Sequence, residues 1–280
     1  MTRTATSAAP SAESALAPWA RDTRPSALQE MLSLTARPGV LSFALGLPAP
    51  ELFPRDEVAR AATRVLAEEP GSLQYAPPLA RLREQVVALM AERGVACAPE
   101  QVFLTAGAQQ GMSLLARLFL QPGGRVVTER LTYTGFRQVL EPFSPSLAQV
   151  DTDPADGMDV DALARLLAHG PRPALIYAMP RGHNPVAAGM SAEKMERLAA
   201  LAARHGVPVI EDDAYGFLQY GPAMRAPLRA LDAEWVCYAG SFSKIMAPGL
   251  RQGWLVVPPS LVPRLAIAKE AADIDTATLA

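Results

Sequence analysis

The sequence predicts an α/β fold in which helices cover both faces of a mostly parallel sheet. The main observation is that short runs rich in β-branched and aromatic residues alternate with stretches of helical periodicity between residues 102 and 257. Such alternation is typical of parallel strands joined by helical crossovers. A second observation is the composition, because 280 residues that are 50% hydrophobic supply enough apolar side chains for a large core.

Composition and charge argue against several classes of protein. A formal net charge of −2 lacks the basic surface of proteins that bind nucleic acids or anionic membranes. No run of about 18 apolar residues would span a bilayer, and the first residues do not resemble a secretory signal. Two cysteines and three scattered histidines predict neither a disulfide framework nor a metal cluster. We therefore expect a cytoplasmic protein without a nucleic-acid, membrane or metal partner.

The chain divides into three segments. Residues 1–25 are rich in Ala, Ser, Thr and Pro without periodicity, which predicts a mobile tail. Residues 26–55 combine a short helix, for which Ser26 is a suitable N-cap, with a crossing segment that glycine and prolines interrupt. Residues 56–280 contain the alternating pattern and are predicted to form the large domain.

The elements follow in order along the chain. Helical periodicity predicts helices at 26–36, 57–69, 79–93, 110–120, 159–168, 192–205 and 261–280. The β-rich runs predict strands at 102–106, 126–129, 174–179, 207–211, 236–239 and 254–257. Since an open α/β sheet binds its ligand beyond the carboxyl ends of its strands, candidate chemistry is expected in the loops after these strands.

The loop after the first predicted strand is glycine-rich and opens a helix. It contains Gly107, Ala108 and Gln109. The free amides of a helix N-terminus, with a glycine beside them, suit a phosphate group. One alternative is an incomplete dinucleotide-binding fingerprint with Glu129 as the ribose ligand, and another is a glycine turn that serves only packing.

Two further loops place polar side chains at strand ends. Asn184 precedes Pro185, which favours an extended backbone that aims the amide, although an ordinary Asn-Pro turn has the same sequence. Asp212 and Asp213 end an apolar strand, where buried carboxylates need a positive partner, and we expect Asp212 to be the more buried. The alternative is that Asp213 caps a helix while Asp212 pairs with a structural arginine.

The loop after the strand at 236–239 carries the most chemistry. Lys244 lies among apolar residues, where desolvation lowers the pKa of its amine and favours a nucleophile. Ser241, Ser243 and Arg251 supply the donors of a phosphate clamp. A surface lysine in a salt bridge is the alternative, but the apolar flanking segment offers no polar face for it.

If these loops converge, they combine a reactive amine, a buried carboxylate, a phenol, an amide and a phosphate clamp. Pyridoxal phosphate requires this set, because its aldehyde condenses with a lysine and its ring nitrogen needs a carboxylate. Tyr133 and Tyr215 are the candidates for the ring face and the ring oxygen. Two other interpretations remain. Ser241 and Lys244 match the S-x-x-K of serine acyl-enzymes without K-T-G or S-D-N, and a nicotinamide dehydrogenase leaves Lys244 and Asp212 without roles.

Seven motifs, in this order, resemble those of the fold-type I pyridoxal-phosphate aminotransferases. They are SFALGLPAPELFP, LQY, TAGAQQG, TERLTYTG, HNP, EDDAYGFL and GSFSKIMAPGLRQGW, which span Ser42 to Trp254. The chain is most similar to the class I/II branch of 2-aminoadipate and kynurenine aminotransferases and of MocR-type regulators. The resemblance implies a three-layer α/β/α large domain of about seven strands, pyridoxal 5′-phosphate as cofactor, amino-acid and 2-oxo-acid substrates, and a homodimer with a shared active site.

The resemblance also implies roles by position. Lys244 would form the internal aldimine and move the proton during a ping-pong transfer, and Asp212 would pair with the pyridine nitrogen. Asn184 and the catalytic Tyr215 would contact the ring oxygen, and Tyr133 would stack on the ring. The phosphate would be held by Gly107, Ala108, Gln109, Ser241, Ser243 and Arg251.

Two positions would lie closer to the partner subunit and the substrate. Tyr75 would reach the cofactor phosphate of the partner subunit, and the backbone at Gly46, with Asn184, would lie near the substrate. The sequence departs from the family pattern in several places; for example, Ala108 stands where a hydroxyl residue is common, and Leu45 replaces a glycine of the substrate pocket.

The chain is also shorter than members of this family. The large domain would be truncated at its C-terminal end, and the small domain, which supplies the arginine for the substrate carboxylate, would be absent. Arg181 is a candidate substitute, with a surface arginine as the alternative. A chain that binds the cofactor without turnover, as a pseudoenzyme or regulatory module, is the second functional hypothesis. Decarboxylation or elimination with the same cofactor is a further alternative.

Overall fold

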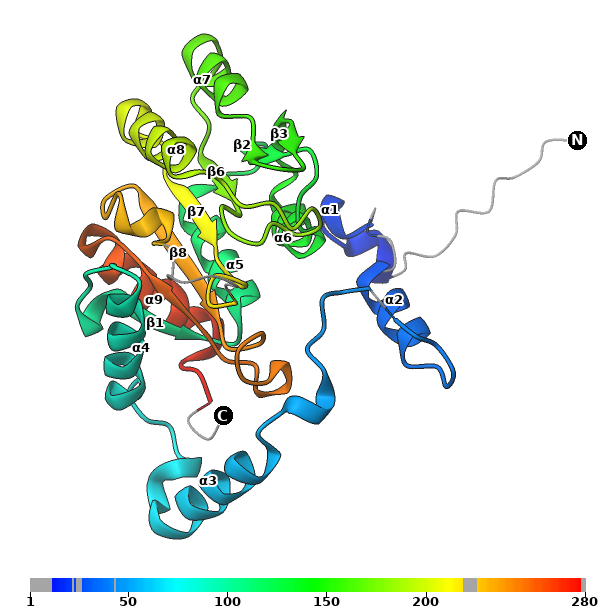
Figure 1. Ribbon diagram of the computed structural model, residues 1–280, viewed down its shortest axis with the longest axis vertical. Coiled ribbons are helices and arrows are strands. Elements are labelled where there is room, and N and C mark those ends of the chain that lie inside the picture. Colours follow the sequence, from blue (N-terminus) through cyan, green and yellow to red (C-terminus); the bar gives the residue numbers. More distant parts are fainter. Residues whose placement is uncertain (1–11, 22, 24–26, 43, 219–225, 278–280) are drawn as a thin grey trace, which may run out of the picture.

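The computed structural model describes residues 12–21, 23, 27–42, 44–218 and 226–277. They form a central sheet with helices on both faces and an N-terminal segment that extends away from the sheet (Figure 1). The predicted α/β fold with a mostly parallel sheet is therefore confirmed. Ser26, the expected N-cap of the first helix, lies outside the described residues.

The central sheet has seven strands in the spatial order β1-β9-β8-β7-β6-β2-β3. Their bounds are β1 (Val102–Thr105), β2 (Arg125–Glu129), β3 (Ser146–Val150), β6 (Leu175–Ala178), β7 (Val209–Asp212), β8 (Val236–Ser241) and β9 (Gly253–Val256). Strands β3, β2, β6, β7 and β8 pair in parallel, whereas β9 is antiparallel to both β8 and β1. All strands except β9 therefore end at the same edge of the sheet.

Helices cover the sheet on two faces. Their bounds are α1 (Pro18–Arg21), α2 (Ala27–Thr35), α3 (Arg55–Glu68), α4 (Ala80–Glu92), α5 (Ala108–Phe119), α6 (Thr134–Leu140), α7 (Val160–His169), α8 (Ala192–His205) and α9 (Val262–Asp273). One buried cluster joins α5, α6 and α9 to the sheet, and the clusters on the opposite face join α7, α8 and α4 to it. Apolar residues fill both sides of the parallel strands, as their near-continuous hydrophobic runs require.

Some elements of the structure were not predicted from the sequence pattern. Strand β3 lies at the sheet edge and buries only its last residue, Val150, so its hydrophobic signal is weak. Helix α6 has seven residues, too few to establish a period. A two-stranded ladder of β4 (Thr152–Asp153) and β5 (Gly157–Met158) is shorter still. The last predicted helix, 261–280, ends at Asp273.

The N-terminal segment contributes little to the core. The described part of the predicted tail, residues 12–21, contains a short 3₁₀ helix (Ala12–Ala15) and α1, which contacts a second 3₁₀ helix at Glu141–Phe143. Helix α3 buries no residue. Over the described ranges, no helix is long and apolar enough to cross a membrane, and no three His, Cys, Asp or Glu side chains gather as a metal site would require.

Candidate active site

A cavity of about 440 Å³ opens at the carboxyl edge of the sheet. Loops that follow β1, β2, β6, β7 and β8 all contribute to its wall. Of the residues expected to act together, the cavity is lined by Ala108, Gln109, Tyr133, Asn184, Asp212, Tyr215, Ser241, Ser243, Lys244 and Arg251. Residues that are far apart in sequence therefore surround one space, as expected for ligand sites in open α/β sheets.

Lys244 lies in the turn that follows β8, and its amine is partly shielded from water. Its Nζ donates a hydrogen bond of 2.9 Å to the carbonyl oxygen of Gly46 and lies 5.5 Å from the ring centroid of Tyr215. Burial lowers the pKa of the Lys244 amine, as the sequence predicted. No carboxylate of the described residues forms an ion pair with Lys244, so the salt-bridge alternative is wrong. A larger share of the amine is therefore neutral and nucleophilic at neutral pH.

Asp212 is the last residue of β7 and is buried against the cavity floor. Its Oδ2 accepts a hydrogen bond of 2.7 Å from the hydroxyl of Tyr177, and its Oδ1 accepts one of 3.3 Å from the backbone N–H of Ala214. Burial raises the pKa of Asp212 to about 6, and these two hydrogen bonds oppose the rise. The carboxylate is therefore preorganised but underpaired, and it suits a cationic partner in the cavity.

Tyr177 is a site residue that the sequence analysis missed. It lies in β6, is buried, and its ring stacks on Phe136 with the ring centroids 3.8 Å apart. Within an otherwise apolar strand, a buried tyrosine hydroxyl needs a hydrogen-bond partner. That requirement was the available signal, but it did not identify Asp212 as the partner.

The change Tyr177→Phe is expected to raise the pKa of Asp212 above about 6, because it removes the hydrogen bond that favours the carboxylate. Native Asp212 binds its proton more tightly than in the unfolded chain, so folding stability falls as the pH rises between about 4 and 6. The variant should extend this fall to higher pH. The ¹³C shift of the Asp212 carboxyl and pH-dependent urea unfolding measure both effects. Tyr238→Phe, which removes a hydroxyl from Asp213 instead, is the control and should move the Asp212 midpoint less.

The neighbouring Asp213 has a structural rather than a cavity position. Its carboxylate accepts hydrogen bonds from the guanidinium of Arg93 and, at 2.9 Å, from the hydroxyl of Tyr238. Asp212 and Asp213 are 2% and 1% exposed, so the two carboxylates are equally buried and the expected difference between them is not seen. The alternative in which Asp212 pairs with an arginine is wrong, because Asp213 makes that pair.

Tyr215 and Asn184 meet above Asp212. The Asn184 side chain hydrogen-bonds to Tyr215, and burial raises the pKa of the Tyr215 phenol while this hydrogen bond opposes the rise. Gly182 lies so close that a Cβ there would come within 2.8 Å of the Cβ of Tyr215. A glycine at this position therefore allows the two loops to pack together and brings the amide and the phenol to one side of the cavity.

An anion-binding corner forms where helix α5 begins. Gly107 precedes the helix with φ of +79°, and a Cβ on it would lie 2.5 Å from Nη2 of Arg251. The Arg251 guanidinium donates to the carbonyl oxygens of Ala106 and Pro248, which leaves further N–H groups for a ligand. Because the first N–H groups of a helix have no intrahelical partner, this corner combines amide donors with a fixed cation.

Replacing Gly107 with alanine is expected to displace Arg251 and to strain the backbone, because the residue has a positive φ and no room for a Cβ. We expect a loss of about 1–3 kcal/mol in the free energy of unfolding and weaker binding of phosphate-bearing ligands. Urea unfolding and equilibrium dialysis with inorganic phosphate measure the two effects. Gly249→Ala is the matched control, because nothing lies within 4 Å of a Cβ at that position. Equal behaviour of the two variants would contradict the prediction.

The remaining residues of the expected phosphate clamp differ in whether their hydrogen-bonding groups are free to bind a ligand. Ser241 ends β8, and its hydroxyl accepts a hydrogen bond of 3.1 Å from the backbone N–H of Ser243, so its own proton remains free to be donated. Gln109 donates its side-chain N–H to the carbonyl oxygen of Gly135 at 2.7 Å, so this N–H group is engaged within the protein. The backbone at Gln109 remains part of the helix start.

Several expected positions lie away from the cavity. Tyr75 is 81% exposed and borders a separate cavity beside the end of α9. Arg181 is buried, donates to the carbonyl oxygens of Met190 and Ala226, and does not line the candidate site. Both suggestions for Arg181, a substrate ligand and a surface residue, therefore disagree with its position. Glu129 lies in a buried pair with His183, 3.2 Å apart, so it does not face a ribose site.

Another part of the cavity wall is apolar, and apart from Leu45 it was not predicted from the sequence. It comes from α2 and the segment after it, through Leu28, Met31, Leu32, Leu45 and Leu47. The periodicity of α2 predicted a helix but not which surface it faces. Leu45 has φ of +69°, a left-handed conformation that costs a non-glycine residue about 1–2 kcal/mol. Its side chain lines the cavity.

Several known protein sequences are similar to this chain. The profile of the family described as aminotransferase class I and II matches residues 42–278. A 2-aminoadipate transaminase from Thermus thermophilus is 39% identical over 261 residues, covering 91% of this chain and 64% of the relative. Aromatic-amino-acid aminotransferase 1 from Thermococcus litoralis is 34% identical over 262 residues, covering 90% and 63%. The chain therefore spans less than two thirds of the length of these two curated relatives.

Solved structures share the same architecture. An α-aminoadipate aminotransferase from Thermus thermophilus, crystallised with N-(5′-phosphopyridoxyl)-L-leucine, superimposes with a TM-score of 0.88 at 36% identity. The superposition covers 96% of this chain and 68% of that chain. The family match starts at residue 42, so it includes every cavity residue discussed above except those of α2.

Proposed function

Because the chain belongs to the aminotransferase class I and II family, we propose that it transfers an amino group between an amino acid and a 2-oxo acid. The cofactor we propose is pyridoxal 5′-phosphate. The single observation that carries the proposal is that the Lys244 amine and the Asp212 carboxylate line one cavity, with Arg251 at the helix start beside them.

The donor set of the cavity fits this cofactor. Its phosphate would be held by the α5 amides after Gly107, by Arg251, and by the hydroxyls of Ser241 and Ser243. Asp212 has an unshared acceptor for a protonated ring nitrogen. A bound pyridoxal ring would supply an electron sink for negative charge at the substrate Cα. Tyr133, whose phenol pKa burial raises, offers an aromatic face in the same wall.

Lys244 is the residue that we propose handles the proton. Its amine is partly desolvated and its pKa is lowered, which lets Nζ accept a proton from the substrate Cα and return it. The carbonyl oxygen of Gly46 holds Nζ at 2.9 Å, and the Tyr215 ring lies on the same side. The amine is thereby oriented before substrate arrives.

Asp212 and Tyr215 would set the charge distribution around the reacting centre. Tyr177 stabilises Asp212 as a carboxylate, so that it can keep a proton on a ring nitrogen beside it. The amide of Asn184 and the phenol of Tyr215, which hydrogen-bond to each other, would orient a ring oxygen. In this proposal, neither Asp212 nor Tyr215 moves during the reaction.

The apolar wall points to the substrate class. Leu28, Met31 and Leu32 face the cavity together with Leu45 and Leu47, and burying a second carboxylate against them would be costly. We propose an amino donor with a large apolar side chain. Two similar proteins carry names that refer to 2-aminoadipate and to aromatic amino acids, so the donor panel should include both.

A donor panel tests the substrate class. Leucine and phenylalanine are expected to exceed aspartate in kcat/KM by at least about tenfold, because each buried methylene contributes about 1–3 kcal/mol of discrimination. Met31→Ala should reduce kcat/KM for leucine but not for alanine, which does not reach the wall. A preference for 2-aminoadipate or aspartate would overturn the proposed substrate class while leaving amino transfer intact.

The reaction type has its own test. The absorption spectrum of the protein with pyridoxal 5′-phosphate is recorded before and after each amino acid, and the products are analysed. A spectral change with formation of the 2-oxo acid and pyridoxamine phosphate supports amino transfer. Release of CO₂ or of a β-substituent identifies decarboxylation or elimination, and an unchanging spectrum identifies a cofactor-binding regulatory module. Each of these outcomes contradicts the proposal.

Assembly and location complete the proposal. The exposed Tyr75 is compatible with the shared active site of a homodimer, in which it would contact the phosphate bound by a partner subunit. We also propose a cytoplasmic location. Sedimentation of the protein with and without cofactor tests the dimer, and Tyr75→Phe should weaken cofactor binding only if the dimer forms.

A further inference from the structure

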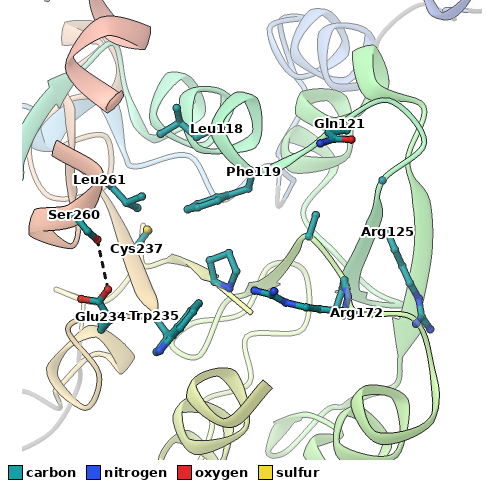
Figure 2. A pocket seen from close by; sticks show the side chains of 14 residues that line it. Leu118, Phe119, Gln121, Arg125, Arg172, Glu234, Trp235, Cys237, Ser260 and Leu261 are labelled. Carbon is teal, nitrogen blue, oxygen red and sulfur yellow. Dashed lines mark hydrogen bonds between the residues drawn. The ribbon is translucent and has the colours of Figure 1, made fainter. Parts of the chain in front are cut away.

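A second and larger cavity lies at the opposite edge of the sheet. It measures about 630 Å³ and is bordered by Arg125, Ala174, Pro208 and Trp235, which begin or immediately precede β2, β6, β7 and β8 (Figure 2). We call it the amino-end cavity. It shares no lining residue with the candidate active site, although the same four strands connect the two edges.

The amino-end cavity has apolar walls that suit a flat organic group. Phe119 from the end of α5 and Trp235 before β8 extend toward the same space from opposite sides (Figure 2). Leu261 closes one flank, and Cys237, which is fully buried, lies at the base. Burial raises the pKa of the Cys237 thiol to about 12, so this sulfur contributes apolar surface and not a nucleophile.

Two arginines give the cavity a positive side. Arg125 donates to the carbonyl oxygen of Pro171 at 2.6 Å, and Arg172 donates to the carbonyl oxygen of Gly206. These bonds orient the guanidinium groups but neutralise neither. Among the described residues, no carboxylate forms an ion pair with either arginine. Each therefore keeps donors for an anion.

Gly206 brings one of these charges next to the aromatic wall. A Cβ at Gly206 would lie 3.3 Å from Nη2 of Arg172 and 3.4 Å from the Trp235 ring. The guanidinium and the indole therefore sit beside the same glycine, which caps α8 with a positive φ. A carboxylate on Arg172 would place the rest of a ligand against Trp235.

The opposite wall limits how many charges a ligand can carry. Glu234 presents its carboxylate there, and the hydroxyl of Ser260 contacts it at 3.5 Å. A second anionic group at that end would be repelled. We propose that the amino-end cavity binds an organic monocarboxylate, with its carboxylate on Arg172 and its aromatic or branched aliphatic body between Phe119 and Trp235.

The proposal is tested with 3-phenylpropanoate as the probe. Binding is measured by calorimetry and by Trp235 emission on the whole chain. We expect saturable binding with a change in tryptophan emission that Trp235→Phe abolishes, since Trp19 and Trp254 lie outside this cavity. Arg172→Ala should weaken binding by about tenfold or more, because a charge-assisted hydrogen bond is lost. Arg81→Ala, which removes an exposed arginine of α4, is the matched control and should leave affinity unchanged.

Ligand chemistry supplies the second arm of the test. The neutral 3-phenylpropanamide and the dianion phenylsuccinate should both bind more weakly than 3-phenylpropanoate. Equal affinity of the amide, an unaltered affinity of Arg172→Ala, or an emission change that persists in Trp235→Phe would each overturn the proposal. Self-association that Arg172→Ala disrupts, without binding of the probe, would assign the cavity to contacts between copies and would overturn it too. Because Lys244→Ala leaves this cavity intact, the outcome does not depend on the proposed amino transfer.

Discussion

Replacing Lys244 with alanine is expected to reduce amino transfer by at least about 10²-fold, because the amine that would accept and return the substrate proton is lost. Lys244→Arg should be as inactive, since a guanidinium keeps the charge but is not deprotonated in proteins. Product formation from leucine and a 2-oxo acid measures both variants. The fold should survive, because the change removes a partly desolvated amine whose pKa is lowered. A melting temperature at or above that of the original protein is expected.

A covalent trap separates this role from a general loss of binding. Incubation with pyridoxal 5′-phosphate, followed by borohydride reduction and peptide mapping, should label Lys244. The other lysines of the sequence are Lys194 and Lys269; Lys194 pairs with Asp156 and Lys269 with Asp273, and neither lines the candidate active site. Lys194→Ala is the control and should retain activity and labelling. A label on either of the other lysines, or activity of Lys244→Ala within tenfold of the original protein, would contradict the assignment.

The residues that sequence alone brought together share one physical property. Asn184 and Lys244 follow apolar strands and Asp212 ends one, and a polar group at the end of a buried strand needs a partner or a ligand. Parallel strands end at one edge of the sheet, so the convergence of these loops follows from the topology. That is why the cavity could be anticipated without coordinates.

The residues that sequence alone missed depend on contacts between distant segments. Tyr177 sits inside an apolar strand, and only the register of β6 against β7 brings its hydroxyl to Asp212. Arg93 follows α4, where a cation is ordinary because of the helix dipole. Its partner Asp213 is 120 residues away. Periodicity identifies helices and strands but carries no information about such pairs.

The same limitation applies to the walls of the two cavities. Helix α2 was predicted from its pattern, yet its orientation over the cavity depends on the crossing segment around Gly46, which has no period. The amino-end cavity is lined by residues at the beginnings of strands. The arginine, proline and tryptophan residues there would each be ordinary at a protein surface. Only their arrangement around one space distinguishes Arg172 and Trp235 from isolated surface residues.

Replacing Arg93 with methionine is expected to lower the free energy of unfolding by about 3–5 kcal/mol, because it leaves the buried carboxylate of Asp213 without its cation. Methionine keeps much of the side-chain volume, so the loss reflects charge more than a cavity. The guanidinium also donates to Tyr238 and lies 4.7 Å from the ring centroid of Phe217. Urea unfolding at neutral pH measures the effect. Arg60→Met is the matched control: its exposed pair with Glu57 is worth about 0–1 kcal/mol.

The pH dependence of the stability of this variant tests the explanation. Burial raises the pKa of Asp213 and Arg93 opposes the rise, so the variant should bind a proton on Asp213 at higher pH than the original protein. Its deficit in stability should therefore shrink as the pH falls. Glu211, whose pKa burial and Asp213 raise to about 8, also acts on this carboxylate, together with Tyr238, Asp212 and Arg181. The double variant Arg93→Met/Asp213→Asn should recover much of the loss. A single variant within about 1 kcal/mol of the original protein, or a double variant no better than the single one, would show that the Arg93–Asp213 pair does not supply this stability.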